Sequence, residues 1–485
     1  MPSRFLVLAI ASAVALPALA ADERTALTLY RADSDQLFAT GSDAVSGDGY
    51  AIVHERRSFS LTGDTQDLSI DGLPAALDSE ALSLRFPGNG TRVVSQRLLL
   101  GQGFDGAVAG LVGHNVTAVG DSGQPIASGT LVRGGDTLVI RDAGGQASLI
   151  RNYAALRASD ANDFARGSTL QVRVAGSGKG QTTAQLDYPT SGLGWRGAYV
   201  ATLSPDATCR MSFDASASIA NRSGRDWKNV SLKLVAGDAN RAKAPPQPKV
   251  FMARAAPAPM AMADAAEMQQ ATLGDLHTYA LPTAVDLPDG SVTQTPIYEG
   301  RTLDCERKAI YDTNMRYYGS APRTEKDIGQ PRDVPVVSTL GFKAFDALPA
   351  GYIRVLTVDR DRNAELLGEG RLSDTPKGKD TTVSLGNAFD LTAKREQTSF
   401  TANPGAHAMD EGTRITLANA GDVKRTIFVR EHPSRWNAWT LTSSSVKPSK
   451  TSPEQIEFQV DIPAHGSVNL DYAVRYTWTD ADVPH

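Results

Sequence analysis

The sequence contains little cysteine and no excess of basic charge. Two cysteines in 485 residues exclude a small disulfide-framework fold and a zinc module built on several cysteines. Lys and Arg number 49 against 54 Asp and Glu, whereas a nucleic-acid-binding protein normally carries a basic patch or stripe. Beyond the first twenty residues, no segment approaches the ~18 uninterrupted apolar residues of a membrane-spanning helix. What remains is an ordinary globular composition, long enough for about two to four domains.

The first twenty residues have the features of a secretory signal peptide. Arg4 supplies a positive charge, an apolar run interrupted only by Ser12 follows, and Ala18-Leu19-Ala20 is a small-x-small cleavage site. We therefore predict cleavage between Ala20 and Ala21, and a mature protein located in the periplasm or outside the cell. Such a compartment is oxidising.

Most of the remaining sequence has the period of β-strands. Apolar residues at Met211, Phe213 and Ala215 alternate with polar ones, which gives one face for a core and one for water. The same alternation runs through 456–462 and 468–476, and the turn signal Pro463-Ala464-His465-Gly466 between them predicts a hairpin. Short strands between frequent turns predict a mainly β, multi-domain fold of antiparallel β-sandwiches or small β-barrels.

Composition divides the chain into several regions. Residues 239–270 are rich in Ala, Pro and Met without a strand period, so we predict a long, mobile, low-complexity insertion. The predicted regions are a signal peptide (1–20), an N-terminal β region (21–160, with lobes 21–100 and 101–160), a β-sandwich region that carries the insertion (169–320), a C-terminal β-sandwich region (330–478) and a polar tail (479–485).

Motifs that resemble catalytic or metal sites are incomplete. Gly120-Asp121-Ser122-Gly123-Gln124-Pro125 is similar to a serine-protease nucleophile loop, but the upstream His and Asp context is missing, and the segment favours a β-turn. The seven histidines are dispersed without zinc-ligand spacing. The sequence therefore assigns no catalytic, cofactor-binding or metal-binding residue and predicts no cofactor. A hydrolase site assembled only in three dimensions, acting on glycan or peptide, stays open as an alternative.

The two cysteines, Cys209 and Cys305, lie in the same predicted β region and have no third cysteine to compete with. In an exported protein this favours a disulfide between them. The alternative is a pair of buried free thiols.

A small surface patch is predicted around Trp436. In a strand, positions three apart face opposite sides, so Trp436 and Trp439 do not both face the core. Trp439 shares a face with Leu441 and is the expected core residue, which places Trp436 near solvent beside Arg435 and His432 as a binding patch for a sugar or a partner loop. The alternative is that Pro433 breaks the strand and Trp436 packs against a neighbouring domain.

Short motifs in a fixed order carry a family resemblance over roughly residues 180–478, with a weaker match near Gly49 to Leu73. The motifs are Leu186-Asp187-Tyr188, Gly194-Trp195-Arg196, Tyr199, Ala220 to Trp227, Val230-Ser231-Leu232, His277-Thr278-Tyr279, Leu287 to Gly290, Gln294, Leu348 to Gly351, Asp374 to Lys377, Ile462-Pro463 and Leu470-Asp471-Tyr472. Together they resemble the bacterial mucoidy-inhibitor-like proteins, which carry a C-terminal domain of unknown function.

That resemblance implies an envelope protein with an effect on exopolysaccharide, and it supplies no catalytic residue. We expect an exported, non-enzymatic protein that acts by binding or scaffolding, with an envelope protein or a polysaccharide as partner. A dedicated carbohydrate-binding protein is the other alternative. Because a Trp side chain buries a large area, Trp195 and Trp227 are predicted core residues.

Overall fold

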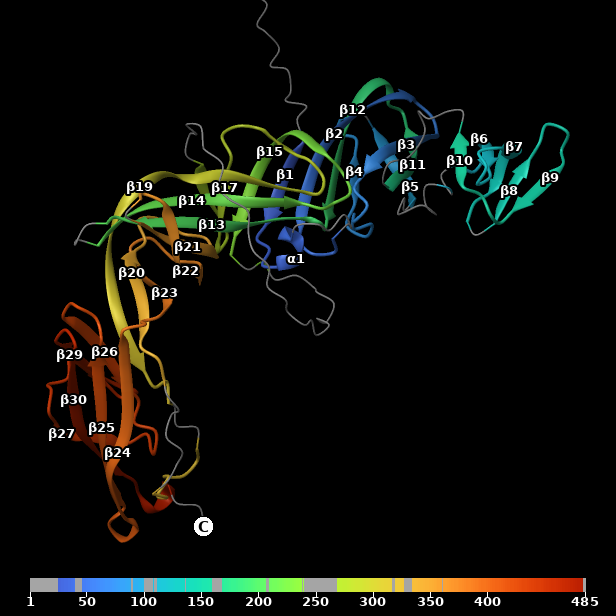
Figure 1. Ribbon diagram of the computed structural model, residues 1–485. Coiled ribbons are helices and arrows are strands. Elements are labelled where there is room, and N and C mark those ends of the chain that lie inside the picture. Colours follow the sequence, from blue (N-terminus) through green and yellow to red (C-terminus); the bar gives the residue numbers. More distant parts are fainter. Residues whose placement is uncertain are drawn as a thin grey trace, which may run out of the picture.

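The computed structural model describes residues 25–39, 46–88, 90–99, 108, 111–135, 137–158, 168–205, 209–237, 239, 268–315, 319–326, 334–359 and 361–482. Their regular structure is β-strand apart from the short helix α1 (Asp35–Phe38), the single helical residue Val108, and the 3-10 turns Pro404–Ala406 and Asp480–Asp482. The predicted mainly β, multi-sheet fold is confirmed (Figure 1). The predicted signal peptide and nearly all of the insertion 239–270 lie outside the described residues.

The described strands form five sheets. An eight-stranded sheet has the order β16 (Gln269–Leu273), β17 (Leu276–Ala280), β15 (Trp227–Ala236), β1 (Ala26–Tyr30), β2 (Ala51–Thr62), β12 (Lys179–Thr190) and β4 (Ser83–Arg85), with β18 (Val285–Leu287) also on β15. A ten-stranded sheet has the order β22 (Ala364–Leu372), β21 (Gly351–Val358), β13 (Leu193–Leu203), β14 (Arg210–Asn221), β19 (Ser291–Asp312), β26 (Arg425–Glu431), β29 (Gln455–Ile462) and β28 (Lys450–Ser452), with β20 (Val337–Lys343) on β19 and β23 (Asp380–Asn387) on β20.

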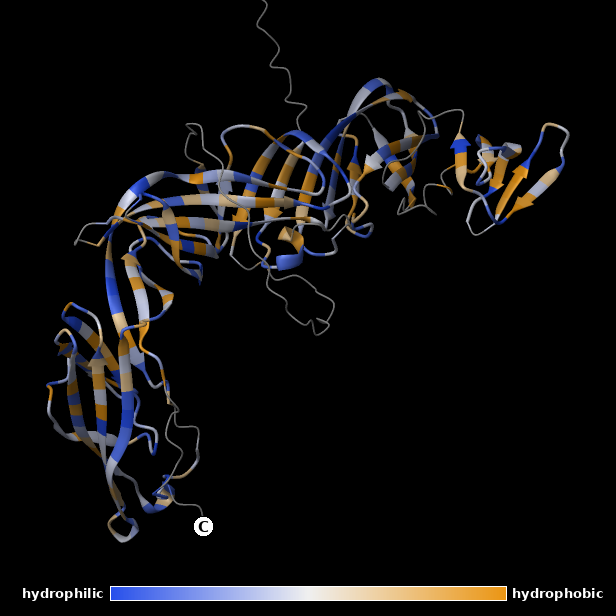
Figure 2. Cartoon of the chain, viewed as in Figure 1, coloured by the Kyte–Doolittle hydropathy of each residue, from blue (hydrophilic) through white to orange (hydrophobic). Residues whose placement is uncertain are grey.

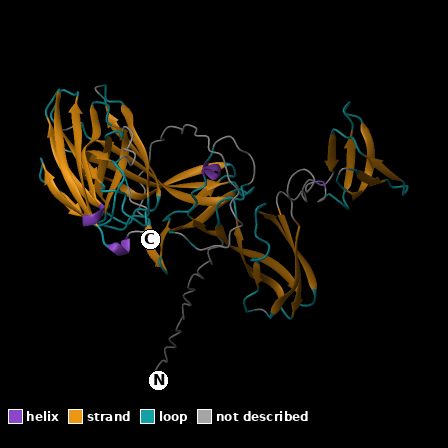
Figure 3. Cartoon of the chain, turned by 90° about the horizontal axis from the view of Figure 1, so that it is seen from below, coloured by secondary structure: helices purple, strands orange, loops and turns teal. Residues whose placement is uncertain are grey.

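The three other sheets are smaller. A four-stranded sheet has the order β24 (Leu391–Asn403), β25 (Ala408–Asn419), β30 (Gly466–Thr477) and β27 (Trp439–Ser444); a three-stranded sheet has β3 (Gln66–Leu73), β11 (Ser168–Gly176) and β5 (Thr91–Leu99); a five-stranded sheet has β10 (Ala155–Ala158), β6 (Asn115–Val119), β7 (Pro125–Arg133), β8 (Leu138–Arg141) and β9 (Ala147–Ile150). In Figures 1 and 3 the five-stranded sheet stands apart, and its own small core includes Leu131, Leu138 and Ile140.

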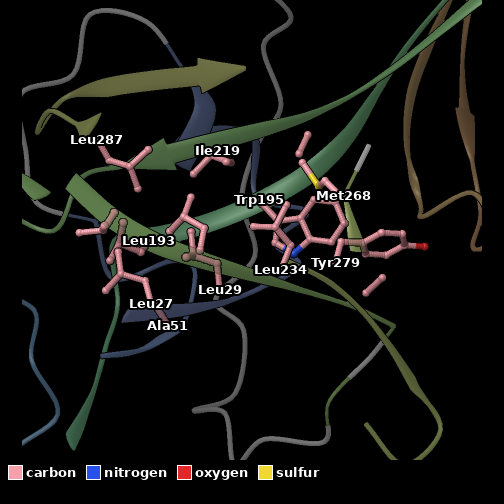
Figure 4. Close-up of a cluster of buried hydrophobic side chains, with 14 of the residues drawn as sticks. Leu27, Leu29, Ala51, Leu193, Trp195, Ile219, Leu234, Met268, Tyr279 and Leu287 are labelled. Carbon is pink, nitrogen blue, oxygen red and sulfur yellow. The ribbon is translucent and has the colours of Figure 1, made fainter. Parts of the chain in front are cut away.

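The period-two pattern of the sequence determines which side chains are buried. Along β14, Met211 and Phe213 are buried while Ser212 and Asp214 are exposed, and Figure 2 shows hydrophobic and hydrophilic bands alternating along the strands. The core of the first sandwich, between the eight-stranded sheet and β13, β14 and the first half of β19, contains Trp195 and Trp227, which confirms both as core residues. Figure 4 shows Trp195 among the buried side chains of this core. The Trp195 indole N–H donates to the Val235 carbonyl at 3.0 Å, so its polar atom is satisfied inside the core.

The chain contains the same sandwich topology twice. In the first sandwich β13 pairs with β14, β14 with β19, and β15 with β18; in the second, β24 pairs with β25, β25 with β30, and β26 with β29. A parallel strand also lies beside β15 and β26 in each case, namely β1 and the second half of β19. The β19 strand therefore belongs to both sandwiches, as the last strand of one and the first of the other.

An asparagine anchors the same corner in each sandwich. Asn221 lies opposite Leu193 and Ser291, and Asn419 lies opposite Leu391 and Gly466. The Asn221 amide donates at 2.8 Å to the carbonyls of Arg225 and Leu287, and its oxygen accepts from the Ser223 N–H at 3.1 Å. We call residues 190–192, 221–227 and 287–291 the first corner.

The second corner comprises residues 388–391, 419–425 and 462–466. The Asn419 amide donates to the carbonyls of Val423, Ile462 and Pro463 at 2.8, 3.4 and 3.1 Å, and its oxygen accepts from the Gly421 N–H at 3.0 Å. Because one side chain satisfies main-chain groups of two turns, each asparagine fixes where the chain crosses between the sheets.

Each anchor is expected to stabilise its own sandwich. Asn221→Ala and Asn419→Ala leave buried carbonyls without a donor, so each should cost about 1–3 kcal/mol in the free energy of unfolding. Chemical denaturation measures this loss. Asn437 is exposed and makes no side-chain hydrogen bond to the described residues, so Asn437→Ala is the matched control, expected to change stability by about 0.5 kcal/mol or less. Equal effects of all three substitutions would contradict the anchoring role.

The predicted hairpin of 456–462 with 468–476 is wrong. The β29 strand pairs with β26 and β28, and β30 pairs with β25 and β27. The turn Pro463 to Gly466 therefore carries the chain from one sheet to the other, because the Asn419 amide binds the carbonyls of Ile462 and Pro463.

The predicted disulfide is confirmed and lies where β19 passes from one sandwich to the other. Cys209 and Cys305 are bonded, and the Cys305 N–H donates to the Cys209 carbonyl at 2.9 Å. Up to Asp304, β19 pairs with β14; from Cys305 onward it pairs with β20. In Figure 1 this 22-residue strand turns from the upper arm of the molecule into the lower one, so we call this point the elbow.

The sheets do not follow the predicted regional boundaries. The β1, β2 and β4 strands, from the predicted region 21–160, share a sheet with β12 and β15. The β21 strand, from the predicted region 330–478, pairs in parallel with β13 of the first sandwich. The reason is that long insertions separate strands that are neighbours in space, and composition follows the chain order alone.

Candidate functional site

The predicted surface patch around Trp436 does not exist. Trp436 is 7% exposed and belongs to the core of the second sandwich, Arg435 is fully buried, and His432 is partly buried. Trp439, the expected core residue, is instead partly buried at the start of β27, and its indole N–H donates to the Pro453 carbonyl at 2.9 Å.

The error comes from applying strand alternation to a segment that is not a strand. The β26 strand ends at Glu431 and β27 begins at Trp439. Residues 432–438, which include Pro433, are irregular in between. The alternative prediction, that Pro433 breaks the strand and Trp436 packs inward, is correct on both points. Trp436 packs in the core of its own sandwich, however, and not against a neighbouring domain.

Arg435 is the centre of a buried polar network. Its guanidinium makes an ion pair with Glu411 at 3.0 Å and lies 4.1 Å from the Phe400 ring centre. It also donates to the carbonyls of Arg323, Glu325 and Lys326 at 3.3, 2.6 and 3.1 Å. One side chain therefore fastens a separate segment, 323–326, to the sandwich.

A second charged pair, Arg395 with Glu431, lies in the same interior. Arg395 donates to Glu431 at 3.0 Å, and the Tyr472 hydroxyl donates to the same carboxylate at 2.5 Å. Burial raises the pKa of Tyr472 well above its usual range, and the neighbouring Glu431 charge adds to this effect. Burial acts to lower the pKa of Arg395, but the charge of Glu431 together with Tyr472 and the hydrogen bonds to both residues outweighs it, and the pKa is raised. Arg395 therefore stays charged and Tyr472 stays neutral.

The cavity beside this network is too small for a substrate. It has a volume of about 10 Å³ and is lined by Arg395, Glu411, Thr413, Ser434 and Tyr472 among others. That is roughly the space of one water molecule, whereas small-molecule sites have volumes of about 300–1,000 Å³. The network is therefore a structural feature of the second sandwich.

His432 makes an ion pair with Asp312 at 3.0 Å at the far end of β19. The hydrogen bond to Asp312 raises the pKa of His432 above 6.5. Burial acts to raise the pKa of Asp312, but the hydrogen bonds from His432 and the Asn314 N–H outweigh it and lower the pKa below 3.8. Both partners are thus charged throughout the range between these two values.

This pair predicts a pH-dependent contribution to stability. A base with a raised pKa stabilises the fold below its unfolded pKa and loses that contribution as pH rises through the folded value, while a lowered acid pKa contributes above the unfolded value. The melting temperature should therefore differ more between the wild type and His432→Gln at about pH 5 than at about pH 9. A difference that is the same at both pH values would contradict the pairing.

The first sandwich also contains a buried carboxylate bound by arginines. Glu55 makes ion pairs at 2.6 Å with Arg225 and with Arg57, and it accepts from the Tyr188 hydroxyl at 3.1 Å. Arg225 in turn lies 4.3 Å from the Trp227 ring centre. The segment from Ala220 to Trp227 is thus held at both ends, by the Asn221 anchor and by Glu55.

No carboxyl group with a shifted pKa resembles a general acid in the described residues. A catalytic acid needs a raised pKa, and each carboxyl group here whose pKa departs from its usual value has it lowered. At Asp187 and Asp312 burial acts in the raising direction, but hydrogen bonds outweigh it. The groups are Asp35, Asp67, Asp187, Asp312, Glu396 and Asp461.

A ligand-sized groove lies where β4 and β5 face each other. Its volume is about 450 Å³, and its lining residues are Leu84, Arg85, Phe86, Pro87, Thr91, Arg92, Val93 and Gln185. Leu84 and Phe86 are buried and form an apolar floor. Both flanking strands are at the ends of their sheets, since β4 pairs with β12 and β5 with β11 among the described strands.

The polar side of the groove is cationic. Arg85 is held by Asp187 at 2.5 Å, and His54 contacts the other oxygen of that carboxylate at 2.6 Å. Arg92 is exposed and makes no ion pair with a described carboxylate. An extended ligand with an apolar face and a negative group fits this lining, which makes the groove the candidate binding site. The sequence contained no signal for it beyond two arginines.

Other sites are not evident in the part of the chain that the structure describes. It holds no group of three or more His, Cys, Asp and Glu side chains placed to bind a metal ion. None of its helices has the length and apolar character needed to cross a membrane. Ser122 lies in a turn closed by the hydrogen bond from the Gly123 N–H to the Gly120 carbonyl, which confirms the β-turn interpretation.

The profile of one protein family matches most of both sandwiches. The family is described as "Domain of unknown function (DUF4139)", and the match covers residues 184–480, more than half of the chain. The chain belongs to the DUF4139 family. No curated protein matches the chain.

The DUF4139 match begins inside β12, and the structure shows what that boundary omits. The β1 strand pairs with β15, and β2 pairs with β12 and β1. The first sandwich of this DUF4139 protein is therefore completed by strands that precede the matched residues. The residues that line the groove also precede the matched residues in sequence, except for Gln185, which belongs to the DUF4139 domain.

Proposed function

We propose that the protein is exported to the periplasm or cell surface and acts there, without catalysis, as a binding or scaffolding protein of the envelope. The observation that carries the proposal is the shared strand β19. One strand of 22 residues is an integral part of two sandwiches, and a disulfide ties it to the first sandwich at the elbow. A continuous strand transmits orientation between its ends better than a flexible linker.

Several further features support this role. The predicted leader and the disulfide both suit an oxidising compartment outside the cytosol. The resemblance to mucoidy-inhibitor-like proteins adds a link to exopolysaccharide or envelope homeostasis. The groove between β4 and β5 supplies a ligand-sized surface beside the eight-stranded sheet of the first sandwich. The partner in this proposal is an envelope protein or an anionic polysaccharide.

A hydrolase is less well supported. The buried carboxylates Glu55, Glu411 and Glu431 each make an ion pair with an arginine, so their oxygens are engaged in contacts that hold the fold together. Carbohydrate binding through exposed aromatic rings is also less well supported, since Phe86 in the groove is only 7% exposed.

The proposal is tested in a deletion strain assayed for envelope integrity and capsule. The wild-type chain should restore the phenotype. A variant with two glycines inserted between Asp304 and Cys305 should be exported and folded but should not restore it. The matched control carries the same insertion between Gly123 and Gln124, in an exposed turn of the small sheet.

Equal complementation by both insertion variants would overturn the scaffolding role. Turnover of a glycan or peptide panel by the purified protein would overturn the non-enzymatic role.

A further inference from the structure

The two corners are built alike, but among the described residues other parts of the chain cover only the first. In the first corner, Arg222 is 6% exposed and Ser223 is fully buried. The Ser46 N–H donates to the Arg222 carbonyl and the Ala75 N–H to the Ser223 carbonyl, both at 3.0 Å. The two covering residues come from the segments before β12, so loop segments lie directly on the turn.

Carbonyl groups of the covering segments also accept hydrogen bonds from main-chain N–H groups of the first corner. The Ser191 N–H donates to the Ala76 carbonyl at 3.0 Å, and the Gly192 N–H donates to the Asp48 carbonyl at 2.8 Å. Gly192 is needed for the close contact between the two turns of the corner itself, since a Cβ there would lie 2.4 Å from the Arg222 carbonyl oxygen. The first corner thus binds other segments of the chain through its main-chain groups, including one isolated bridge between Leu77 and Thr190.

The second corner presents equivalent groups to solvent. Phe389, the counterpart of Ser191, is 98% exposed, and Val423, the counterpart of Arg225, is 63% exposed. The N–H groups of Phe389 and Asp390 and the carbonyl of Ala420 have no hydrogen-bond partner among the described residues. The Ala420 N–H donates to the Asp390 carbonyl at 2.8 Å. This hydrogen bond joins the turn that carries Phe389 to the turn that carries Val423.

Arg425 lies two residues after Val423, and a second arginine, Arg307, lies next to Arg425. Ala309 lies opposite Ile427 in the parallel pairing of β19 with β26, so Arg307 and Arg425, two residues earlier on each strand, are neighbours. Burial lowers the pKa of Arg307, and the charge of Arg425 lowers it further. Neither makes an ion pair with a described carboxylate. A ligand that brings a carboxylate would relieve this repulsion.

We propose that the second corner binds an extended segment of a partner protein, with apolar side chains on Phe389 and Val423, main-chain hydrogen bonds to the turns, and a carboxylate at Arg425. Residues 73–80 of this chain have that chemistry, since Leu77 bridges to Thr190 in the first corner and Asp78 and Glu80 follow. The inference deepens the proposed binding role and rests on it, but it concerns one surface.

A peptide with the sequence of residues 72–80 is the probe. We expect saturable binding of the fluorescein-labelled peptide to the full chain by fluorescence anisotropy. Phe389→Ser with Val423→Ser, and separately Arg425→Ala, should each weaken binding by about tenfold or more. A peptide with Asn and Gln in place of Asp78 and Glu80 should also bind more weakly. Leu366 is 59% exposed on β22, so Leu366→Ser is the control and should bind as the wild type does.

Several outcomes would overturn the proposal. These are no saturable binding, equal binding by the Phe389→Ser, Val423→Ser variant, or a self-association of the chain that this variant abolishes, which would identify a second copy as the occupant. Circular dichroism establishes that the variants are folded. Failure here with normal complementation in the deletion strain would remove the docking surface and leave the scaffolding role intact.

Discussion

Replacing Arg435 by methionine is expected to destabilise the second sandwich by about 3–5 kcal/mol, because removing one partner of a buried ion pair leaves the other charge uncompensated. Glu411 would lose its ion pair, and the carbonyls of Arg323, Glu325 and Lys326 would lose their donor. Hydrogen-exchange mass spectrometry locates the loss, which should affect β25 and β30 and spare β13 and β14.

Two further variants separate charge from packing. Arg414 makes an exposed pair with Asp471, so Arg414→Met should leave the exchange protection nearly unchanged. Adding Glu411→Leu to Arg435→Met removes the stranded charge and should recover part of the loss. An Arg435→Met variant with the protection of the wild type would contradict the structural role of the network.

Removing the disulfide is the second large expected effect. The bond closes a loop with a sequence separation of 96 residues, and on the chain-entropy model such a closure stabilises the fold by about 4–5 kcal/mol. Cys209→Ser with Cys305→Ser should therefore lower the free energy of unfolding of the first sandwich by that order. Denaturation with and without reductant measures it.

The reductant gives an internal control. Wild-type protein should lose stability when it is reduced, and the double serine variant should not respond. Wild-type stability that is unaffected by complete reduction would show that the two sulfurs contribute only as packed side chains.

The local pattern of the sequence was sufficient for the fold class. Alternation at Met211 to Ile219 placed the buried face of β14 correctly, and the two cysteines in one predicted region were enough for the disulfide. Trp195 and Trp227 were predicted core residues because of their size, and they are buried. These inferences depend on neighbours in sequence or on residue type alone.

The failures occurred where long-range pairing decides the outcome. The turn at Pro463 to Gly466 looks the same in sequence whether it closes a hairpin or crosses between sheets, and the distant Asn419 decides between them. Trp436 was placed on a strand that ends at Glu431. The groove joins β4 with β5 and Gln185, residues separated by insertions that hide their proximity.

We expect the continuous strand β19 to hold the two sandwiches in one fixed relation, with the disulfide bracing it against the first sandwich at the elbow. Ser212 on β14 and Gln459 on β29 are exposed, one on each sandwich. Because both native cysteines are bonded to each other, Ser212→Cys with Gln459→Cys allows selective spin labelling. Double electron–electron resonance on this variant should give a single narrow distance distribution that does not change with salt. A broad or multi-peaked distribution in the oxidised protein would contradict the claim.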